Sequence, residues 1–126
     1  MRILKVEIAD TPTKQHDGLM FRKELADDAG MAFKFGNPQT LNFWGLNTYI
    51  PLDIAFVSPE NKIIKIDYIK PMSMHTVTSD GDCLYAIEAN VGYFAENDVV
   101  VGDEVSFDED NDGFPVVVFK KIVEGK

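Results

Sequence analysis

The sequence predicts one domain of mainly β structure (α+β): a mostly antiparallel, partly closed barrel or rolled sheet with one or two short helices. Three observations lead to this fold class. About eight short apolar runs recur along the chain, with turn-forming residues between them. The 126 residues suffice for one core, and no repeat or linker divides residues 1–126 into separate units. Hydrophobic residues make up 45% and charged residues 26%, as is typical of folded proteins.

The first expected elements are a strand and a short helix. Residues 2–9 alternate between charged and apolar side chains, which predicts a half-buried strand. Thr11 and Pro12 form an N-cap followed by proline at the first helical position. We therefore expect a helix from Pro12 to Gly18, where glycine ends it, and a second helical turn over 23–26.

Four strands are expected in the middle of the chain. Short apolar runs predict them over residues 31–35, 41–44, 52–57 and 63–68. Gly36-Asn37-Pro38 predicts a turn between the first two strands, and Ser58-Pro59-Glu60-Asn61 predicts one between the last two. The run at 52–57 is apolar on both faces except for one aspartate, so we expect it to be covered on both sides.

The last third of the chain is expected to form a long loop and three strands. The polar stretch 70–82 predicts the loop, and 84–89 predicts the strand that follows it. Residues 104–107 and 115–123 flank an acidic turn, which predicts a C-terminal hairpin over 104–123.

Charge and composition limit the possible partners. The formal net charge is −9, from 21 acidic and 12 basic residues, and such a surface repels phosphate backbones and anionic lipids. We therefore expect neither nucleic-acid nor membrane binding. Residues 1–7 alternate between charged and apolar side chains, unlike a signal peptide, which predicts a cytoplasmic location for the chain as given. The single cysteine, Cys83, excludes an internal disulfide and is expected to be a buried small hydrophobe.

Several motifs are similar to those of one protein family. They are Gly18-Leu-Met-Phe-Arg22, Gly30-Met-Ala-Phe33, Phe43-Trp44-x-x-Asn47-Thr48-x-Ile50-Pro51-Leu52-Asp53, Ala86-Ile-Glu-Ala-Asn-Val-Gly92 and Val101-Gly102-Asp103. Over about residues 5–107 the chain resembles the family called domain of unknown function 192, or uncharacterised protein family 0127, which carries no established activity. The resemblance implies a short helix at 92–97 and export signals in many relatives. It also shows a departure, because Gly45 and Leu46 stand where the family has methionine and lysine.

Asp53 is the most informative polar residue of these motifs. A carboxylate in a strand that is apolar on both faces is costly unless it is paired or hydrogen-bonded. Arg22 is the natural partner, since a guanidinium group offers two parallel hydrogen bonds. Two interpretations remain open: a ligand site, and a buried clamp that ties residues 18–22 to the sheet.

Glu88 is a second carboxylate in an apolar strand. Together with Asp53 it could form an acid–base pair, and it could equally accept hydrogen bonds from backbone amides of the turn at 90–92. Trp44 is expected either in the core or as a stacking platform at the mouth of a pocket. The resemblance implies that these residues cluster with Asn47 and Arg22 around a shallow cleft.

The sequence contains no complete catalytic constellation, phosphate loop or paired-cysteine motif. The leading hypothesis is therefore a non-catalytic domain, without a cofactor, that binds an unknown small molecule or protein; its oligomeric state is not indicated. The candidate ligand-binding residues are Arg22, Trp44, Asn47, Asp53 and Glu88. The alternative is an enzyme that uses Asp53 and Glu88 on a sugar or cell-wall substrate.

Residues 108–113 match the first half of a calcium loop, with oxygen-bearing side chains at Asp108, Asp110 and Asp112. The glutamate expected at position twelve is Phe119, so an EF-hand is rejected. A weak calcium contact through these three aspartates and a plain acidic hairpin turn remain as alternatives.

Overall fold

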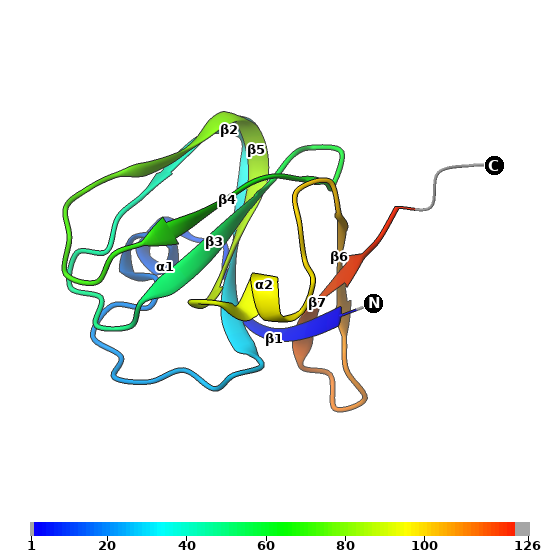
Figure 1. The fold of residues 1–126 in the computed structure, drawn as a ribbon, viewed down its shortest axis with the longest axis horizontal. Helices are drawn as coiled ribbons and strands as arrows, with labels where there is room; N and C mark the ends of the chain where they lie inside the picture. Colours follow the sequence, from blue (N-terminus) through cyan, green and yellow to red (C-terminus); the bar gives the residue numbers. More distant parts are fainter. Residues whose placement is uncertain (1, 123–126) are drawn as a thin grey trace.

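A computed structural model describes residues 2–122, which form a seven-stranded sheet with two short helices (Figure 1). The elements in chain order are β1 (Arg2–Ala9), α1 (Pro12–Asp17), β2 (Ala29–Phe43), β3 (Leu52–Val57), β4 (Ile63–Ile69), β5 (Val77–Asn90), α2 (Tyr93–Glu96), β6 (Glu104–Glu109) and β7 (Pro115–Lys120). The order in the sheet is β4-β3-β5-β2-β1-β7-β6. All neighbouring pairs are antiparallel except β1 with β2. The predicted mainly β fold class is confirmed.

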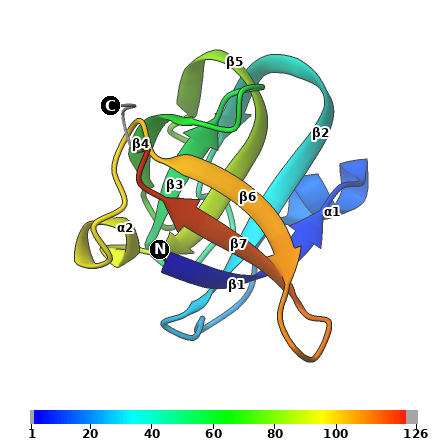
Figure 2. The same ribbon diagram turned by 90° about the vertical axis from the view of Figure 1, so that its right-hand side faces the viewer.

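The sheet curls into a half-barrel. A few backbone hydrogen bonds join its two edge strands, β4 and β6, near their ends. Figure 2 shows β6, β7 and β1 crossing in front of the rest of the sheet. Lys62, next to β4, forms an isolated bridge with Glu104 of β6. The Ile63 amide donates a hydrogen bond to the Asp103 carbonyl at 3.0 Å, and the Val105 amide donates one to the Asn61 carbonyl at 2.8 Å. These contacts give the partly closed barrel that the sequence predicts.

Local capping explains the elements that were predicted well. The Thr11 hydroxyl accepts a hydrogen bond from the Lys14 amide at 3.2 Å, and Pro12 opens α1 as expected. Gly18, with φ +48°, follows the last helical residue. The C-terminal hairpin forms as predicted, with β7 ending at Lys120, whereas the predicted end of this strand at residue 123 lies outside the described residues.

The predicted turn at 36–38 is wrong, and two predicted strands are halves of the single strand β2. The pairing of β2 with β5 shifts between Lys34 and Gln39, so the residues between them form a bulge rather than a chain reversal. Pro38 lacks the amide hydrogen that a regular ladder requires. Bulges and turns favour the same residue types, and for this reason the sequence did not distinguish them.

The predicted loop at 70–82 is also too long, because β5 begins at Val77. The start of this strand has a polar sequence, but Ser79 is only 1% exposed and its hydroxyl accepts a hydrogen bond from the Leu41 amide at 2.9 Å. Because its hydroxyl is hydrogen-bonded, Ser79 can be buried at a strand position where an apolar side chain would be usual.

The second helical turn, predicted over 23–26, does not form. This segment is irregular and is tied to the sheet by the Asn90 side-chain amide. That amide donates hydrogen bonds to the carbonyl oxygens of Leu25 at 2.8 Å and Ala26 at 3.1 Å. A side chain remote in sequence thus fixes the segment in a non-helical form.

The two faces of the sheet bury separate apolar clusters. The first cluster includes Leu4, Ile87, Phe94, Val117 and Phe119. The second cluster includes Leu19, Phe33, Leu52, Ile54 and Phe56. Leu19 follows α1 and packs in the same cluster as the apolar side chains of β3, as the sequence predicts for the segment 18–22. The second cluster forms the floor on which α1 lies.

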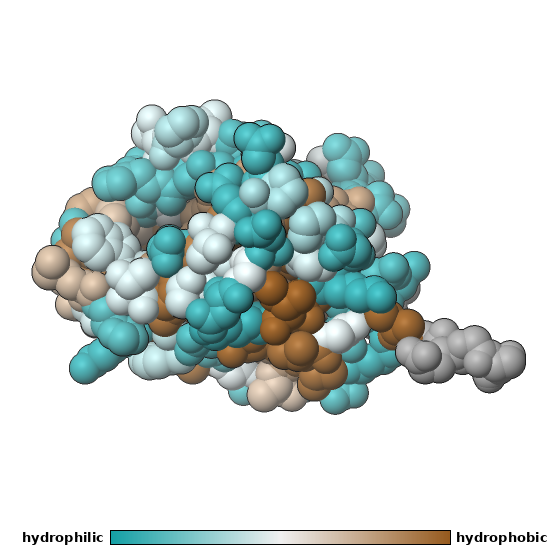
Figure 3. All heavy atoms as spheres, turned by 90° about the horizontal axis from the view of Figure 1, so that it is seen from above, coloured by the Kyte–Doolittle hydropathy of each residue, from teal (hydrophilic) through white to brown (hydrophobic). Residues whose placement is uncertain are grey.

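One face of the molecule is drawn by hydropathy in Figure 3. This face is mostly hydrophilic, with several smaller apolar patches. Among residues 2–122, neither helix has the length and apolar character needed to cross a membrane.

Candidate functional site

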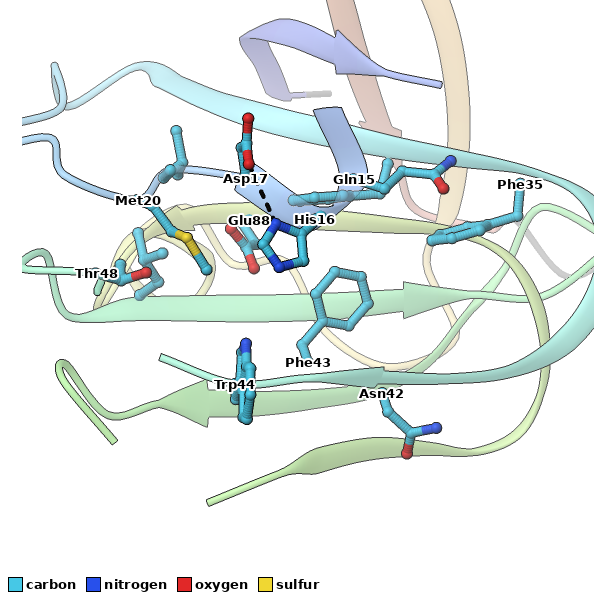
Figure 4. Close-up of a pocket in the computed structure, with 14 residues that line it drawn as sticks. Gln15, His16, Asp17, Met20, Phe35, Asn42, Phe43, Trp44, Thr48 and Glu88 are labelled. Atoms are coloured by element: carbon cyan, nitrogen blue, oxygen red, sulfur yellow. Dashed lines mark hydrogen bonds and ion pairs between the residues drawn. The ribbon is translucent and has the colours of Figure 1, made fainter. Parts of the chain in front are cut away.

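A pocket of about 280 Å³ lies between α1 and the face of the sheet that carries the second cluster (Figure 4). Gln15 holds α1 in place, because its side-chain amide donates a hydrogen bond to the Lys34 carbonyl of β2 at 2.7 Å. The pocket is lined by Gln15, His16, Asp17, Gly18, Leu19, Met20, Phe33, Phe35, Asn42, Phe43, Trp44, Thr48, Leu52 and Glu88. Its volume is near the lower end of small-molecule sites, roughly 300–1,000 Å³.

Glu88 places a buried carboxyl group in this pocket. On β5 it lies opposite Met31 of β2 and Ile54 of β3, so its side chain shares a face with theirs. The residue is only 4% exposed. Burial raises the pKa of Glu88 from 4.5 to about 8, because water no longer stabilises the charged form. The carboxyl group is therefore mainly protonated at neutral pH.

Glu88 differs from the other buried polar side chains between residues 2 and 122, because no protein group forms a hydrogen bond with its carboxyl group. The others, namely Thr48, Ser58, Ser79 and Asp103, each form at least one side-chain hydrogen bond. In this part of the chain no fully enclosed side-chain oxygen or nitrogen lacks a partner. The Glu88 oxygens must therefore open into the pocket, where a bound molecule could reach them.

Aromatic rings form much of the pocket wall. The centroids of Phe33 and Phe43 are 4.9 Å apart in an edge-to-face arrangement. Trp44 is 39% exposed and lies with Phe43 on the other side of the pocket from α1 (Figure 4). Trp44 is therefore not a core residue, the first of its two alternatives, and its role as a stacking platform stays a prediction.

No sequence pattern indicates that α1 belongs to the site. His16 and Asp17 line the pocket, and the His16 Nδ1 atom is 3.2 Å from the Asp17 carboxylate. Both side chains are largely exposed. An exposed helix end carries no local signal of the surface across which it lies, so only the tertiary structure shows their position.

Arg22 lies outside the pocket, and its predicted pairing with Asp53 is wrong. Its guanidinium group forms a two-pronged ion pair with Glu7 of β1, with Nη2 and Oε1 2.7 Å apart. The hydrogen bond from Arg22 lowers the pKa of Glu7. This partner was not predicted, because in the sequence Glu7 resembles any charged residue on the solvent-exposed face of an alternating strand.

We expect Arg22→Met to lower the free energy of unfolding by less than about 1 kcal/mol, because the Arg22 and Glu7 side chains are 36% and 47% exposed. Double-mutant cycles measured by urea denaturation test the pairing. A cycle of Arg22→Met with Glu7→Gln should give a coupling of about 0.5 kcal/mol, and one with Asp53→Asn should give none. A larger coupling with Asp53 than with Glu7 would contradict this assignment.

Asp53 has a structural role in the turn before α2. Its carboxylate accepts a hydrogen bond from the Gly92 amide at 2.8 Å, and Gly92, with φ +90°, is the N-cap residue of α2. This is the role that the sequence analysis gave to Glu88 as an alternative. Asp53 pairs with Ala89 on β5, one position along from Glu88.

The geometry excludes the predicted acid–base pair of Asp53 and Glu88. Neighbouring positions along a strand point to opposite faces of the sheet. Glu88 shares its face with Ile54, whereas Asp53 shares the other face with Ala89. The two carboxylates therefore cannot flank one substrate, and the carboxylate-enzyme alternative loses its basis.

Asn47 is a turn residue rather than part of the pocket lining. It has φ +56°, and its carbonyl oxygen accepts a hydrogen bond from the Phe21 amide at 2.8 Å. Nearby, a Cβ atom at Gly45 would overlap the Lys70 carbonyl oxygen, so the larger residue of the family pattern would not fit here unless the backbone shifted. Of the five predicted site residues, the structure brings Trp44 and Glu88 together at the pocket.

The acidic turn at 108–113 caps its own hairpin. The Asp110 carboxylate accepts hydrogen bonds from the Asp112 and Phe114 amides, each at 2.9 Å, and the Asp108 carboxylate accepts one from the Glu109 amide at 2.8 Å. No cluster of three or more His, Cys, Asp or Glu side chains within residues 2–122 is arranged to hold a metal ion. The weak calcium contact predicted here gains no support.

Cys83 is buried in the second cluster, as predicted. Burial raises the pKa of its thiol, which disfavours the reactive thiolate form.

Comparisons with known proteins give a family and two related structures. The sequence model of DUF192, described as "Uncharacterized ACR", matches residues 1–107. A protein of unknown function from Novosphingobium aromaticivorans is 36% identical with a TM-score of 0.81, and the match covers 83% of this chain and 76% of that one. A Sinorhizobium meliloti protein described as a candidate transcription regulator is 35% identical with a TM-score of 0.78, covering 80% and 79%. No curated protein matches this chain.

Proposed function

Since the chain belongs to the DUF192 family, whose description names no activity, we propose its function from its own pocket: it binds a small, mainly apolar molecule between α1 and the sheet and catalyses no reaction on it. The observation that carries this proposal is Glu88, a buried carboxyl group without a protein partner among residues 2–122 that opens into an aromatic pocket. Apolar walls with a few well-placed polar groups are typical of small-molecule sites.

The described part of the chain supports binding better than catalysis. His16 and Asp17 are hydrogen-bonded at the pocket, but Thr48 is the one serine, threonine or cysteine among the described residues that line it. The Thr48 hydroxyl donates its hydrogen to the Leu46 carbonyl at 3.2 Å and so is not activated by the imidazole.

The description of the Sinorhizobium meliloti relative as a candidate transcription regulator suggests how such binding could be used. A domain that binds a small molecule could give a regulator its sensitivity to that molecule. Direct contact with DNA is a poorer fit for this chain, because its net charge of −9 opposes binding to phosphates.

A protein-interaction role is the second candidate. It is favoured by exposed apolar side chains on two loops next to the pocket: Phe21 is 64% exposed and Met72 is 55% exposed. Both have positive φ angles, and their amides are hydrogen-bonded to the segment that follows Trp44. The two candidates separate experimentally, since Phe21→Ser should weaken a protein complex and leave small-molecule binding unchanged.

We expect a panel of small aromatic and alicyclic molecules to contain ligands that raise the melting temperature and change the fluorescence of Trp44, the single tryptophan. Trp44→Ala should weaken binding about tenfold by removing one wall of the pocket. Tyr49→Ala is the matched control, because Tyr49 is an exposed aromatic residue in the same loop but lies outside the pocket lining. Failure of the whole panel, or equal effects of both variants, would reject this function.

A further inference from the structure

The ionisable side chains that line the pocket are mainly acidic. Among residues 2–122, the lining has two acidic residues, Asp17 and Glu88, and one residue that can carry a positive charge, His16, but no lysine or arginine. An anionic molecule would therefore meet two carboxyl groups and no permanent cation. A cation would meet two groups able to pair with it.

The aromatic rings of the pocket wall also favour a cationic ligand. The faces of Phe43 and Trp44 carry the negative part of the ring quadrupole, which attracts organic ammonium groups. The same rings also provide apolar area for a hydrocarbon body. In Figure 4 these rings lie across the pocket from α1, with the Glu88 carboxyl group between the two sides.

Resting on the proposed function, we propose that the ligand is a small organic amine, bound as its ammonium cation against the Glu88 carboxylate, with its hydrocarbon body along Trp44 and Phe43. Glu88 supplies the buried carboxyl group of the described lining, so it fixes which end of the ligand enters first. The pocket volume of about 280 Å³ limits the body to about one ring or a short chain.

Binding of an amine is linked to a proton. In the free protein Glu88 is mainly protonated at neutral pH, because burial raises its pKa to about 8. An ammonium group stabilises the ionised form, so each binding event releases close to one proton below this pH. The affinity should then rise about tenfold from pH 6 to pH 7 and about fivefold from pH 7 to pH 8, where an aliphatic amine remains charged.

The other charged groups near Glu88 are few. Facing it from α1 are His16 and Asp17, while the neighbouring strand positions on its face are Met31 of β2 and Ile54 of β3. Glu7 of β1 lies beyond Met31 and is paired with Arg22. A His16→Gln variant therefore removes the imidazole from the pocket lining and leaves Glu88 in place.

The test uses three molecules of nearly equal shape: phenethylamine, 2-phenylethanol and phenylacetate. Titrations followed by Trp44 fluorescence at pH 6, 7 and 8 should show the amine binding most tightly, with the stated rise in affinity retained in His16→Gln. Glu88→Gln should weaken amine binding at pH 8 by at least about tenfold and abolish the pH dependence, while binding of the alcohol changes little. Calorimetry of the unaltered protein at pH 7, in two buffers of different ionisation enthalpy, should show about one proton released per amine bound.

Tighter binding of the alcohol or of phenylacetate, or no proton release with the amine, would overturn the amine inference and leave the proposed function standing. Binding of none of the three would also overturn it. The proposed function itself fails only by its own test, if the wider panel yields no ligand or if Trp44→Ala and Tyr49→Ala have equal effects. The calorimetric result needs no variant, so it decides the matter even if Glu88→Gln does not fold.

Discussion

Gly30→Ala is expected to lower the free energy of unfolding by about 3 kcal/mol or more. Gly30 lies in β2 opposite Ala89 of β5, and a Cβ atom at this position would overlap the Glu88 carbonyl oxygen. It would also lie 3.0 Å from a methyl carbon of Leu4. The overlap is with backbone, which cannot rotate away, so β2 and β5 must separate beside the pocket.

Gly36→Ala is the control for this prediction. Gly36 belongs to the same strand, but a Cβ atom there would have no neighbouring atom within 4 Å. We expect this exchange to be neutral or slightly stabilising, since alanine reduces the freedom of the unfolded chain. Urea denaturation of both variants measures the difference, and similar losses of stability in the two would contradict the close approach of β2 and β5 at Gly30.

The elements that the sequence predicted well depend on neighbours in the chain. The alternation over 2–9 and the Thr11–Pro12 start of α1 act within a few residues, and both appear in the structure. The bulge at 36–38 was missed because a proline can leave the ladder without reversing the chain. Asn90, which holds the segment at 23–26 out of helical form, lies more than sixty residues away.

The part of the candidate site that was predicted also depends on features visible in the local sequence. Trp44 and Glu88 stood out because their side chains are unusual in apolar segments, and that anomaly is visible in sequence. Which face each carboxylate occupies depends on the register between β3 and β5, and this separates Glu88 from Asp53. Arg22 pairs with Glu7 of β1. The parallel pairing of β1 with β2, beside which this ion pair lies, is not indicated by any local pattern.

Glu88→Gln is expected to raise the free energy of unfolding by about 3 kcal/mol at pH 7. The pKa of Glu88 is about 8 in the folded protein and 4.5 in its ordinary state. Between these values the unfolded chain has lost the proton while the folded chain keeps it. Stability from this group is therefore complete below about pH 4.5, falls by about 1.4 kcal/mol per pH unit, and falls no further above about pH 8. Glutamine keeps the shape of the side chain and does not titrate, so it avoids this loss.

The measurement is urea denaturation of both proteins from pH 4 to pH 9. Subtracting the two stability curves removes the contribution of every other titrating group, and the difference should grow in favour of Glu88→Gln from about pH 5 to pH 8 and then level off. Glu24→Gln is the matched control, because Glu24 is exposed and its exchange should leave the curve unchanged. A difference curve that is flat with pH would mean that the Glu88 carboxyl group is already ionised in the folded protein at neutral pH. An amine would then release no proton on binding, and the amine inference, which requires this release, would be wrong.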